Sequence, residues 1–390
     1  MASWPVFAED ERAAAMGVLE SGRVNYWGGT EGRAFETEFA AYTGATHAIA
    51  VANGTVAIEL ALHALGIGPG DDVIVPSRTF VGTATAVVAR GARPVVADID
   101  PVSGNLTVET IAAAMTAATE CIIPVHLAGW PCDMDAIMGF AEQQGLVVVE
   151  DCAQAHGAQW NGRHVGTFGH AGAFSFCQDK IMTTAGEGGM LITNDEALWQ
   201  SAWEYKDHGR SMAAMDRAAQ AGGYEFKYVV ESFGTNWRMT EVQAAVGRVQ
   251  LGKLDEWVEA RRANAALLDE APEGIPGIRV TLPPTEAYHA YYKYYAQVDT
   301  AALADGWSRA RILDEMNSRG AVCLQGTSTE IYRERAFVDA GLVPAERLPV
   351  AAELDASSIM LLVDPTHGAS DILHTASVLR EVMTEATGGA

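Results

Sequence analysis

Along most of the chain, the hydrophobic and polar positions alternate between a strand-like pattern and a helix-like pattern. From about residue 45, short apolar runs rich in β-branched residues are each followed by a stretch with helical periodicity, beginning with 47–52 and 54–66. This succession is typical of crossover units, in which helices connect parallel strands. Further runs of the same kind lie at 71–76, 93–100, 120–127 and 145–153. The pattern predicts an α/β fold with a mostly parallel central sheet.

The alternation of strand-like and helix-like patterns changes after residue 153. The apolar runs at 171–177 and 189–195 are separated by eleven residues, too few for a usual helical crossover, so we expect an antiparallel connection. A long amphipathic helix is predicted over 240–270. Beyond it, 290–299 has the alternation of a strand and 308–320 the period of a helix.

Length and composition agree with two domains. The chain has 390 residues, of which 49% are hydrophobic, enough to bury a large core. We expect an N-terminal segment and large domain over 1–250. The long helix would then lead into a smaller C-terminal α/β domain over 251–390.

Net charge and cysteine content limit the classes of molecule that we expect this protein to bind. With 26 basic and 50 acidic residues, the net charge is −24, which disfavours contact with nucleic acid and anionic membranes and leaves small molecules or proteins. The first residues show no signal-peptide pattern and no apolar run has the length of a membrane span, so we expect a cytoplasmic protein. Five widely spaced cysteines indicate neither a disulfide framework nor a metal site.

One lysine stands out at the edge where parallel sheets bind ligands, beyond the carboxyl ends of their strands. The chain holds five lysines, and the first of them, Lys180, follows the run at 171–177. Its amine is a candidate nucleophile. An ordinary surface lysine after a strand is the alternative.

A carboxylate follows a neighbouring strand. Asp151 lies near the end of the run at 145–153, with Gln154 and His156 shortly after it. A carboxylate beside a pyridine nitrogen keeps that nitrogen protonated, and the amide and imidazole could donate to a ring oxygen. Helix capping is the alternative for Asp151.

A helix N-terminus completes the set. Gly54, Thr55 and Val56 open the helix at 54–66, where free N–H groups and the helix dipole favour an anion. An ordinary turn and helix cap is the alternative for the Asn-Gly-Thr sequence. Phe80, at the start of another predicted helix, could cover a ring with its aromatic face, or could be a core residue. Amine, acid and anion site are the minimum parts for pyridoxal phosphate chemistry.

These stretches also resemble a known family. "NGTVAIELAL", "VIVPSRTFVGTA", "VVEDCAQAHGA", "FSFCQDKIMTTAGEGGMLITND" and "GTNWRMTEVQAAVGRVQLGKL" are similar to the motifs of the DegT/DnrJ/EryC1/StrS family of sugar aminotransferases, in order from about residue 5 to residue 260. The resemblance implies a fold type I pyridoxal phosphate enzyme, like aspartate aminotransferase.

The resemblance also implies roles for single residues. Lys180 would bond covalently to the cofactor, Asp151 would pair with the pyridine nitrogen and Gln154 would lie by the ring hydroxyl. The phosphate would be held by Gly54, Thr55 and Ser175, with Phe80 stacked on the ring. Asn236 would reach the phosphate from the neighbouring subunit, so the active site would require a homodimer.

Lysine at position 180 further implies an aminotransferase, because dehydratases of the family carry histidine there. The expected reaction moves an amino group from glutamate or glutamine to a keto sugar, a nucleotide-linked 4-keto or 3-keto hexose. A cyclitol ketone such as scyllo-inosose is an alternative acceptor. A regulatory protein that keeps the cofactor pocket without catalysis is a more remote alternative.

Substrate contacts are less well marked. Tyr26 and Trp27, in "SGRVNYWGGTEG", are candidates, and packing against the sheet is their alternative. Basic residues in or near the motifs could bind a nucleotide diphosphate: Arg23, Arg78, Arg163, Lys206, Arg210 and Arg238. A solvated or structural charge is the alternative for each of them. The histidines His126, His164, His170 and His208 show no metal-ligand spacing and are expected in turns or at the surface.

Overall fold

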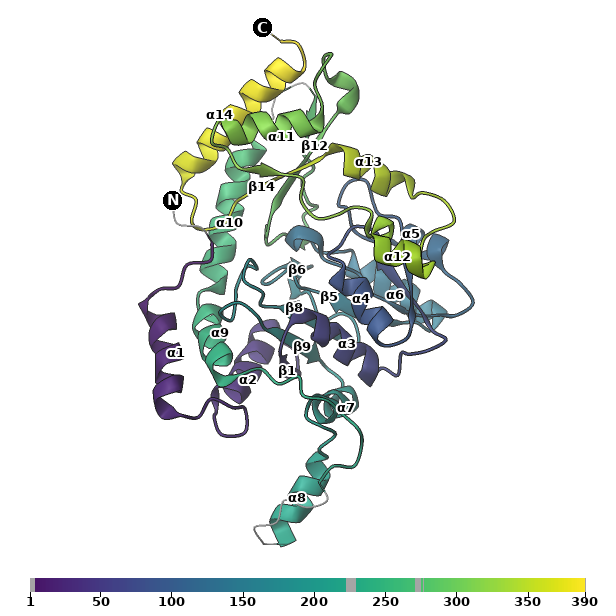
Figure 1. Cartoon of the computed structure of the whole chain (residues 1–390), viewed down its shortest axis with the longest axis vertical. Coiled ribbons are helices and arrows are strands. Elements are labelled where there is room, and N and C mark those ends of the chain that lie inside the picture. Colours follow the sequence, from purple (N-terminus) through teal and green to yellow (C-terminus); the bar gives the residue numbers. More distant parts are fainter. Residues whose placement is uncertain (1–3, 222–228, 271–274, 276, 390) are drawn as a thin grey trace.

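The computed structural model of the chain describes residues 4–221, 229–270, 275 and 277–389. Its centre is a seven-stranded sheet (Figure 1). Among the described strands of this sheet, β9 alone runs antiparallel to its neighbours, so the predicted mostly parallel sheet and the antiparallel return are both confirmed. In spatial order the strands are β1 (His47–Val51), β9 (Gly189–Thr193), β8 (Ala171–Ser175), β5 (Val147–Asp151), β4 (Thr119–Ile122), β2 (Asp72–Pro76) and β3 (Arg93–Ala97).

Helices cover both faces of this sheet because successive strand residues point to opposite sides. Val73 and Val75 of β2 pack into one cluster, and Ile74 between them packs into another. The first face carries α3 (Gly54–Ala64), α4 (Gly82–Ala89) and α7 (Glu196–Lys206). The second carries α2 (Glu31–Thr43), α5 (Val108–Ala114), α6 (Met134–Gln144) and α9 (Glu241–Leu251).

The helix predicted over 240–270 is interrupted. It forms α9 and α10 (Leu254–Asp269), with a turn at Gly252 and Lys253 between them. The ammonium of Lys253 lies 2.8 Å from Asp10 and 2.9 Å from Glu11 of α1 (Glu9–Ser21). The prediction of one continuous helix was therefore wrong, because a residue in the middle of the amphipathic pattern is bound to another helix at a turn.

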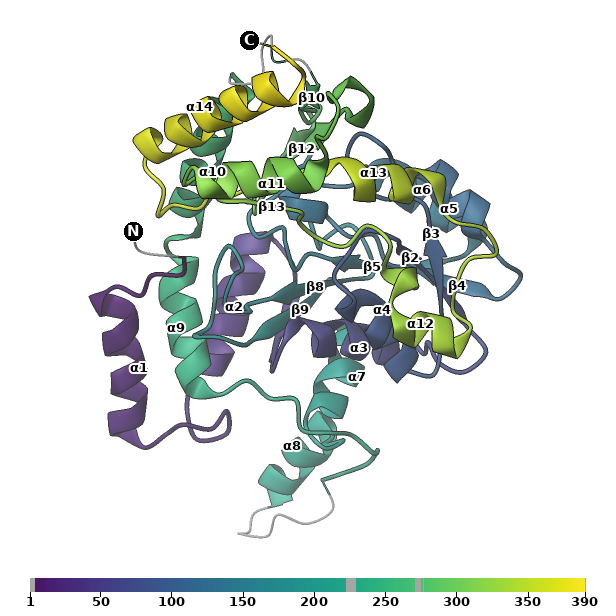
Figure 2. The same ribbon diagram turned by 45° about the horizontal axis from the view of Figure 1, so that its top comes forward.

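A second, four-stranded antiparallel sheet forms the smaller C-terminal unit, and it confirms the strand and helix predicted near 290–299 and 308–320. Its spatial order is β10 (Ile278–Arg279), β12 (Tyr294–Val298), β14 (Ser358–Leu361) and β13 (Cys323–Leu324). One cluster packs it against α10, α11 (Arg309–Ser318) and α14 (Ala369–Ala386), which lie together at one end of the molecule in Figure 2.

The two units share elements. Val258 of α10 packs with the large sheet, whereas Leu268 of the same helix packs with the small one. Ile331 and Phe337, late in the sequence, return to the cluster on the α3 face of the large sheet. The division into 1–250 and 251–390 stays a prediction, since both sides of that boundary contribute to one core.

The remaining described elements are short or peripheral. α8 (Met212–Ala221) projects away from the body of the molecule (Figure 1). Within the described ranges, no helix is long and apolar enough to span a bilayer. The other elements are η1 (Leu127–Gly129), β6 (Gln159–Trp160), β7 (Arg163–His164), β11 (Ala287–Tyr288), η2 (Thr300–Ala302), η3 (Ile331–Arg333), α12 (Arg335–Ala340) and α13 (Pro349–Ser357).

Candidate active site

A cavity of about 1060 Å³ opens beyond the carboxyl ends of β1, β2, β5 and β8, the edge at which a parallel sheet binds ligands. Pockets of this size accommodate a cofactor together with a small substrate. The structure brings seven of the candidate residues together in its wall: Gly54, Thr55, Phe80, Asp151, Gln154, Ser175 and Lys180.

Asp151 presents a buried carboxylate at the end of β5. One carboxylate oxygen accepts a hydrogen bond from the hydroxyl of Thr83 at 2.7 Å, and the other accepts the N–H of Ala153 at 3.0 Å. Burial raises the pKa of Asp151, while these two hydrogen bonds and the nearby Lys180 oppose the rise. The carboxylate of Asp151 is thus positioned to accept a hydrogen bond from a cationic N–H group in the cavity.

Gln154 is fixed by its amide oxygen, which accepts the N–H of Ala128 at 2.8 Å. Its amide NH₂ group is therefore left to donate a hydrogen bond into the cavity.

His156 does not share this role, contrary to our expectation. Its ring is buried against Phe174 and Phe176, and this burial lowers the pKa of His156 to about 3.

The first turn of α3 forms a cradle for an anion. The Asn53 side chain accepts the N–H of Val56 at 3.0 Å, so Val56 is not a free donor as we had expected. Gly54 and Thr55 occupy the positions whose N–H groups have no partner within a helix. A Cβ on Gly54 would lie 2.6 Å from the Cβ of Ser175, so only glycine leaves this space open between helix and strand.

Lys180 lies in the turn after β8 and is held from several sides. Its carbonyl accepts the indole N–H of Trp4 at 2.7 Å. Its ammonium lies 3.9 Å from Asp179 and 4.9 Å from the centre of the Tyr292 ring. The Tyr292 hydroxyl donates to the same Asp179. The amine of Lys180 is thus placed by an aromatic face and a carboxylate.

Three candidates lie outside the described wall of this cavity. Asn236 is exposed in the segment before α9, and its contact with a cofactor in a neighbouring subunit stays a prediction. Tyr26 is buried and donates to Glu36 at 3.0 Å. Trp27 packs edge-on against Trp203. Packing, the alternative we had left open for both aromatic residues, is what the structure shows within this chain.

Residues that sequence patterns had not marked complete the wall. Asp179 and Tyr292 contact Lys180, and Lys293, Glu187 and residues 324–328 line the same cavity. The scarcity of lysine that drew attention to Lys180 applied equally to Lys293. None of the six basic residues proposed for a diphosphate belongs to the described lining, where Lys180 and Lys293 are the cationic side chains.

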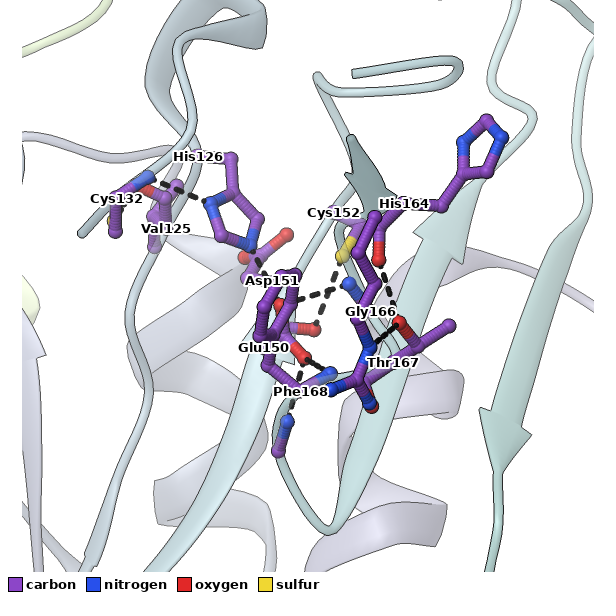
Figure 3. Close-up of polar contacts among 12 residues, drawn as sticks. Val125, His126, Cys132, Glu150, Asp151, Cys152, His164, Gly166, Thr167 and Phe168 are labelled. Atoms are coloured by element: carbon purple, nitrogen blue, oxygen red, sulfur yellow. Dashed lines mark hydrogen bonds and ion pairs between the residues drawn. The ribbon is translucent and has the colours of Figure 1, made fainter. Parts of the chain in front are cut away.

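A second buried cluster includes Glu150 of β5 itself (Figure 3). Ligand-type atoms of His126, Glu150 and Cys152 lie within 4.8 Å of one another. We expected His126 in a turn or at the surface; it does precede the turn η1, but its ring is fully buried. Its Nε2 lies 3.1 Å from Glu150, and its Nδ1 accepts the N–H of Cys132 at 3.0 Å.

Glu150 has further partners in Figure 3. Its carboxylate accepts three backbone N–H groups, each at 2.7 Å, from Gly166, Phe168 and Gly169. Because the ring nitrogens and the carboxylate oxygens already bond within the protein, the cluster acts as a hydrogen-bond network. It ties the 166–169 loop to the strand that carries Asp151.

The residues of the large cavity fit pyridoxal phosphate. The fit rests on an amine at Lys180, a buried carboxylate at Asp151, a directed amide at Gln154 and a phosphate-sized cradle beside Gly54. Phe80 adds an aromatic side chain that is 66% exposed, as a ring-stacking residue requires. Fold and site together define a fold type I, pyridoxal phosphate-dependent aminotransferase.

The comparisons identify the family. The model of the DegT/DnrJ/EryC1/StrS aminotransferase family matches residues 5–380, and the chain belongs to this family. It is 48% identical to an aminotransferase from Psychrobacter cryohalolentis whose structure superposes with a TM-score of 0.96 over 99% of each chain.

Two curated relatives have defined reactions in their names. The dTDP-3-amino-3,4,6-trideoxy-alpha-D-glucose transaminase of Streptomyces venezuelae is 35% identical over 96% of this chain and 92% of its own. The UDP-N-acetyl-3-dehydro-alpha-D-glucosamine 3-aminotransferase of Acidithiobacillus ferrooxidans is 40% identical over 72% of this chain and 74% of its own. The predicted family, fold class, enzyme class and cofactor are confirmed.

Proposed function

We propose that this enzyme transfers an amino group from glutamate or glutamine to a nucleotide-linked keto sugar, a 3-keto or 4-keto hexose. One observation carries the proposal: a single cavity brings together Lys180, Asp151, Gln154 and the first turn of α3. The names of two relatives describe nitrogen at carbon 3 of the sugar. That agreement favours the 3-keto acceptor.

Each residue has a distinct task in this reaction. Pyridoxal phosphate bound here supplies an aldehyde that captures amines and a ring that accepts electrons. Asp151 would accept the ring N–H, and Gln154 would donate to the ring hydroxyl. The amine of Lys180 would move the proton at the substrate carbon as general base and acid. The N–H groups of Gly54 and Thr55, with Ser175, would hold the phosphate.

Absorbance tests this proposal directly. Purified protein supplied with pyridoxal phosphate should acquire the visible band of lysine-bound cofactor, and glutamate or glutamine should remove it. Borohydride reduction and peptide mapping should then find the cofactor on Lys180. A Lys180→Ala variant should show neither result. Cofactor fixed on any other lysine would overturn the assignment.

The acceptor is identified by a panel of nucleotide-linked 3-keto and 4-keto hexoses together with scyllo-inosose. Each is scored by whether it restores the visible band after glutamate has removed it. The cyclitol stays in the panel for a structural reason: the described wall offers no arginine for a diphosphate. A regulatory protein without catalysis would respond to none of these ketones.

We also propose a homodimer with shared active sites and a cytoplasmic location. The exposure of Asn236 and of the neighbouring Phe233, which is 99% exposed, supports a partner over this segment. Light scattering of the purified protein tests the dimer, and a monomer with full activity would contradict it.

A further inference from the structure

Lys293 is a charged side chain in the active-site wall that none of the cofactor roles uses. It is half-buried, just before β12, and its ammonium lies 4.8 Å from the centre of the Tyr292 ring. Lys180 contacts the same ring at 4.9 Å. Lys293 forms no hydrogen bond or ion pair with any residue that the structure describes, whereas Lys180 has Asp179 at 3.9 Å.

The charges around the cavity make Lys293 distinctive. Apart from Lys180, it is the one cationic side chain in the described lining, and the lining carboxylates outnumber the two lysines: Glu59, Asp151, Asp179, Glu187 and Glu334. Once the amine of Lys180 is bonded to the cofactor, Lys293 is the full positive charge that this wall offers to a substrate. An anionic substrate group would be repelled by the carboxylates elsewhere along the wall.

The charges and burial around Lys293 favour the binding of an anion beside its ammonium. Burial lowers the pKa of Lys293, and the positive charges of Arg261 and Lys180 lower it further, whereas the negative charges of Asp179 and Asp364 raise it. Placing an ammonium in such a wall is costly unless a ligand supplies the opposite charge.

We propose that Lys293 binds a carboxylate of the substrate as a specificity-determining residue. This inference rests on the proposed function, because an aminotransferase must admit an amino acid donor, and every such donor carries an α-carboxylate. A carboxylate on the sugar acceptor is the second possible source of the same chemistry. Both would place their charge against Lys293 while the reacting carbon faces Lys180.

A binding measurement gives the first test. Calorimetry on cofactor-loaded enzyme would measure the dissociation constant of glutarate, an unreactive dicarboxylate. Lys293→Met should weaken binding about ten- to hundredfold, the size of a lost charged hydrogen bond, and Lys293→Arg should remain close to wild type. Lys253→Met, which removes a lysine bound to α1 outside the cavity, is the matched control and should bind normally.

The source of the carboxylate is found from two matched substrate pairs. One pair is glutamate and 4-aminobutyrate, which lacks the α-carboxylate; the other is a nucleotide-linked amino hexuronate and the corresponding amino hexose. Each is scored by the rate at which it discharges the visible cofactor band. The Lys293→Met variant should lose discrimination within one pair, and that pair identifies donor or sugar.

The contradicting results are distinct from a failure of the proposed function. If Lys293→Met binds glutarate as wild type does and keeps both discriminations, or if it slows all four amines equally, the carboxylate contact is wrong although the enzyme is an aminotransferase. If the wild-type protein forms no visible band, or if neither glutamate nor glutamine discharges it, the proposed function fails and this inference fails with it.

Discussion

The cradle beside α3 offers a sharp test of how the cofactor phosphate is held. In Gly54→Ala, the new Cβ would lie 2.6 Å from the Cβ of Ser175 and 3.1 Å from its Cα. Non-bonded carbons prefer about 3.5 to 4.0 Å, so helix and strand must separate by roughly 1 Å. Overpacking of this kind costs about 1 to 3 kcal/mol, which predicts a five- to hundredfold loss of pyridoxal phosphate affinity.

The assay is a titration of apoprotein with pyridoxal phosphate, followed by the visible band, together with the unfolding free energy of the apoprotein. Gly139→Ala in α6 is the matched control, since a Cβ there meets nothing within 4 Å. It should stabilise the apoprotein by about 0.5 to 1 kcal/mol, because alanine is the better helix former, and leave cofactor affinity unchanged.

A second variant separates crowding from any other effect of the alanine. Ser175→Gly removes the Cβ that Gly54→Ala would meet at 2.6 Å. Adding Gly54→Ala to Ser175→Gly should therefore cost less affinity than adding it to wild type, which is a double-mutant cycle with a defined sign. Wild-type affinity in Gly54→Ala alone, or strict additivity in the double variant, would refute the reasoning.

Three further predictions follow from other contacts. Thr83→Val removes the 2.7 Å hydrogen bond to the buried aspartate and should slow the reaction with glutamate about tenfold; an unchanged rate would exclude that positioning role. If Asn236 acts across a dimer, mixing inactive Lys180→Ala with Asn236→Ala should restore activity through one intact site per mixed dimer, whereas no recovery would place Asn236 in its own subunit's site. A hydrogen bond to Asp364 raises the pKa of His367 above 6.5, so the stability that it adds should be fully present below that pH and lost as the pH rises through the raised pKa of the folded protein. His367→Gln should flatten that change in denaturation curves, and an equal slope in both proteins would contradict it.

The place of the candidate cofactor residues could be predicted because it follows from strand direction. Asp151 ends β5 and Lys180 follows β8, two neighbouring parallel strands of one sheet, and Gly54 begins the helix that follows β1. The carboxyl ends of such strands must meet at one edge. Apolar periodicity and strand-end chemistry therefore determined both the sheet and the part of the site built on it.

Packing between distant segments could not be predicted in the same way. The buried positions of Tyr26 and His126 depend on partners from other elements. Glu36 of α2 and Lys206 of α7 contact Tyr26, and Glu150 of β5 contacts His126. Isolated aromatic and histidine residues look alike in a sequence whether they line a cavity or fill a core. The break between α9 and α10 has the same origin, since the amphipathic pattern continues through it.

By itself, the sequence determined the class of chemistry, because Lys180, Asp151 and the first turn of α3 occupy places fixed by local strand and helix order. Only the tertiary structure brought Tyr292, Lys293 and 324–328 into the wall of the cavity that holds Lys180. Lys293 precedes β12 and 324–328 begins in β13 of the smaller sheet, so their approach depends on how α10 and this sheet pack against the large one. Cofactor chemistry is thus determined by local order, whereas the substrate-facing wall is determined by long-range packing.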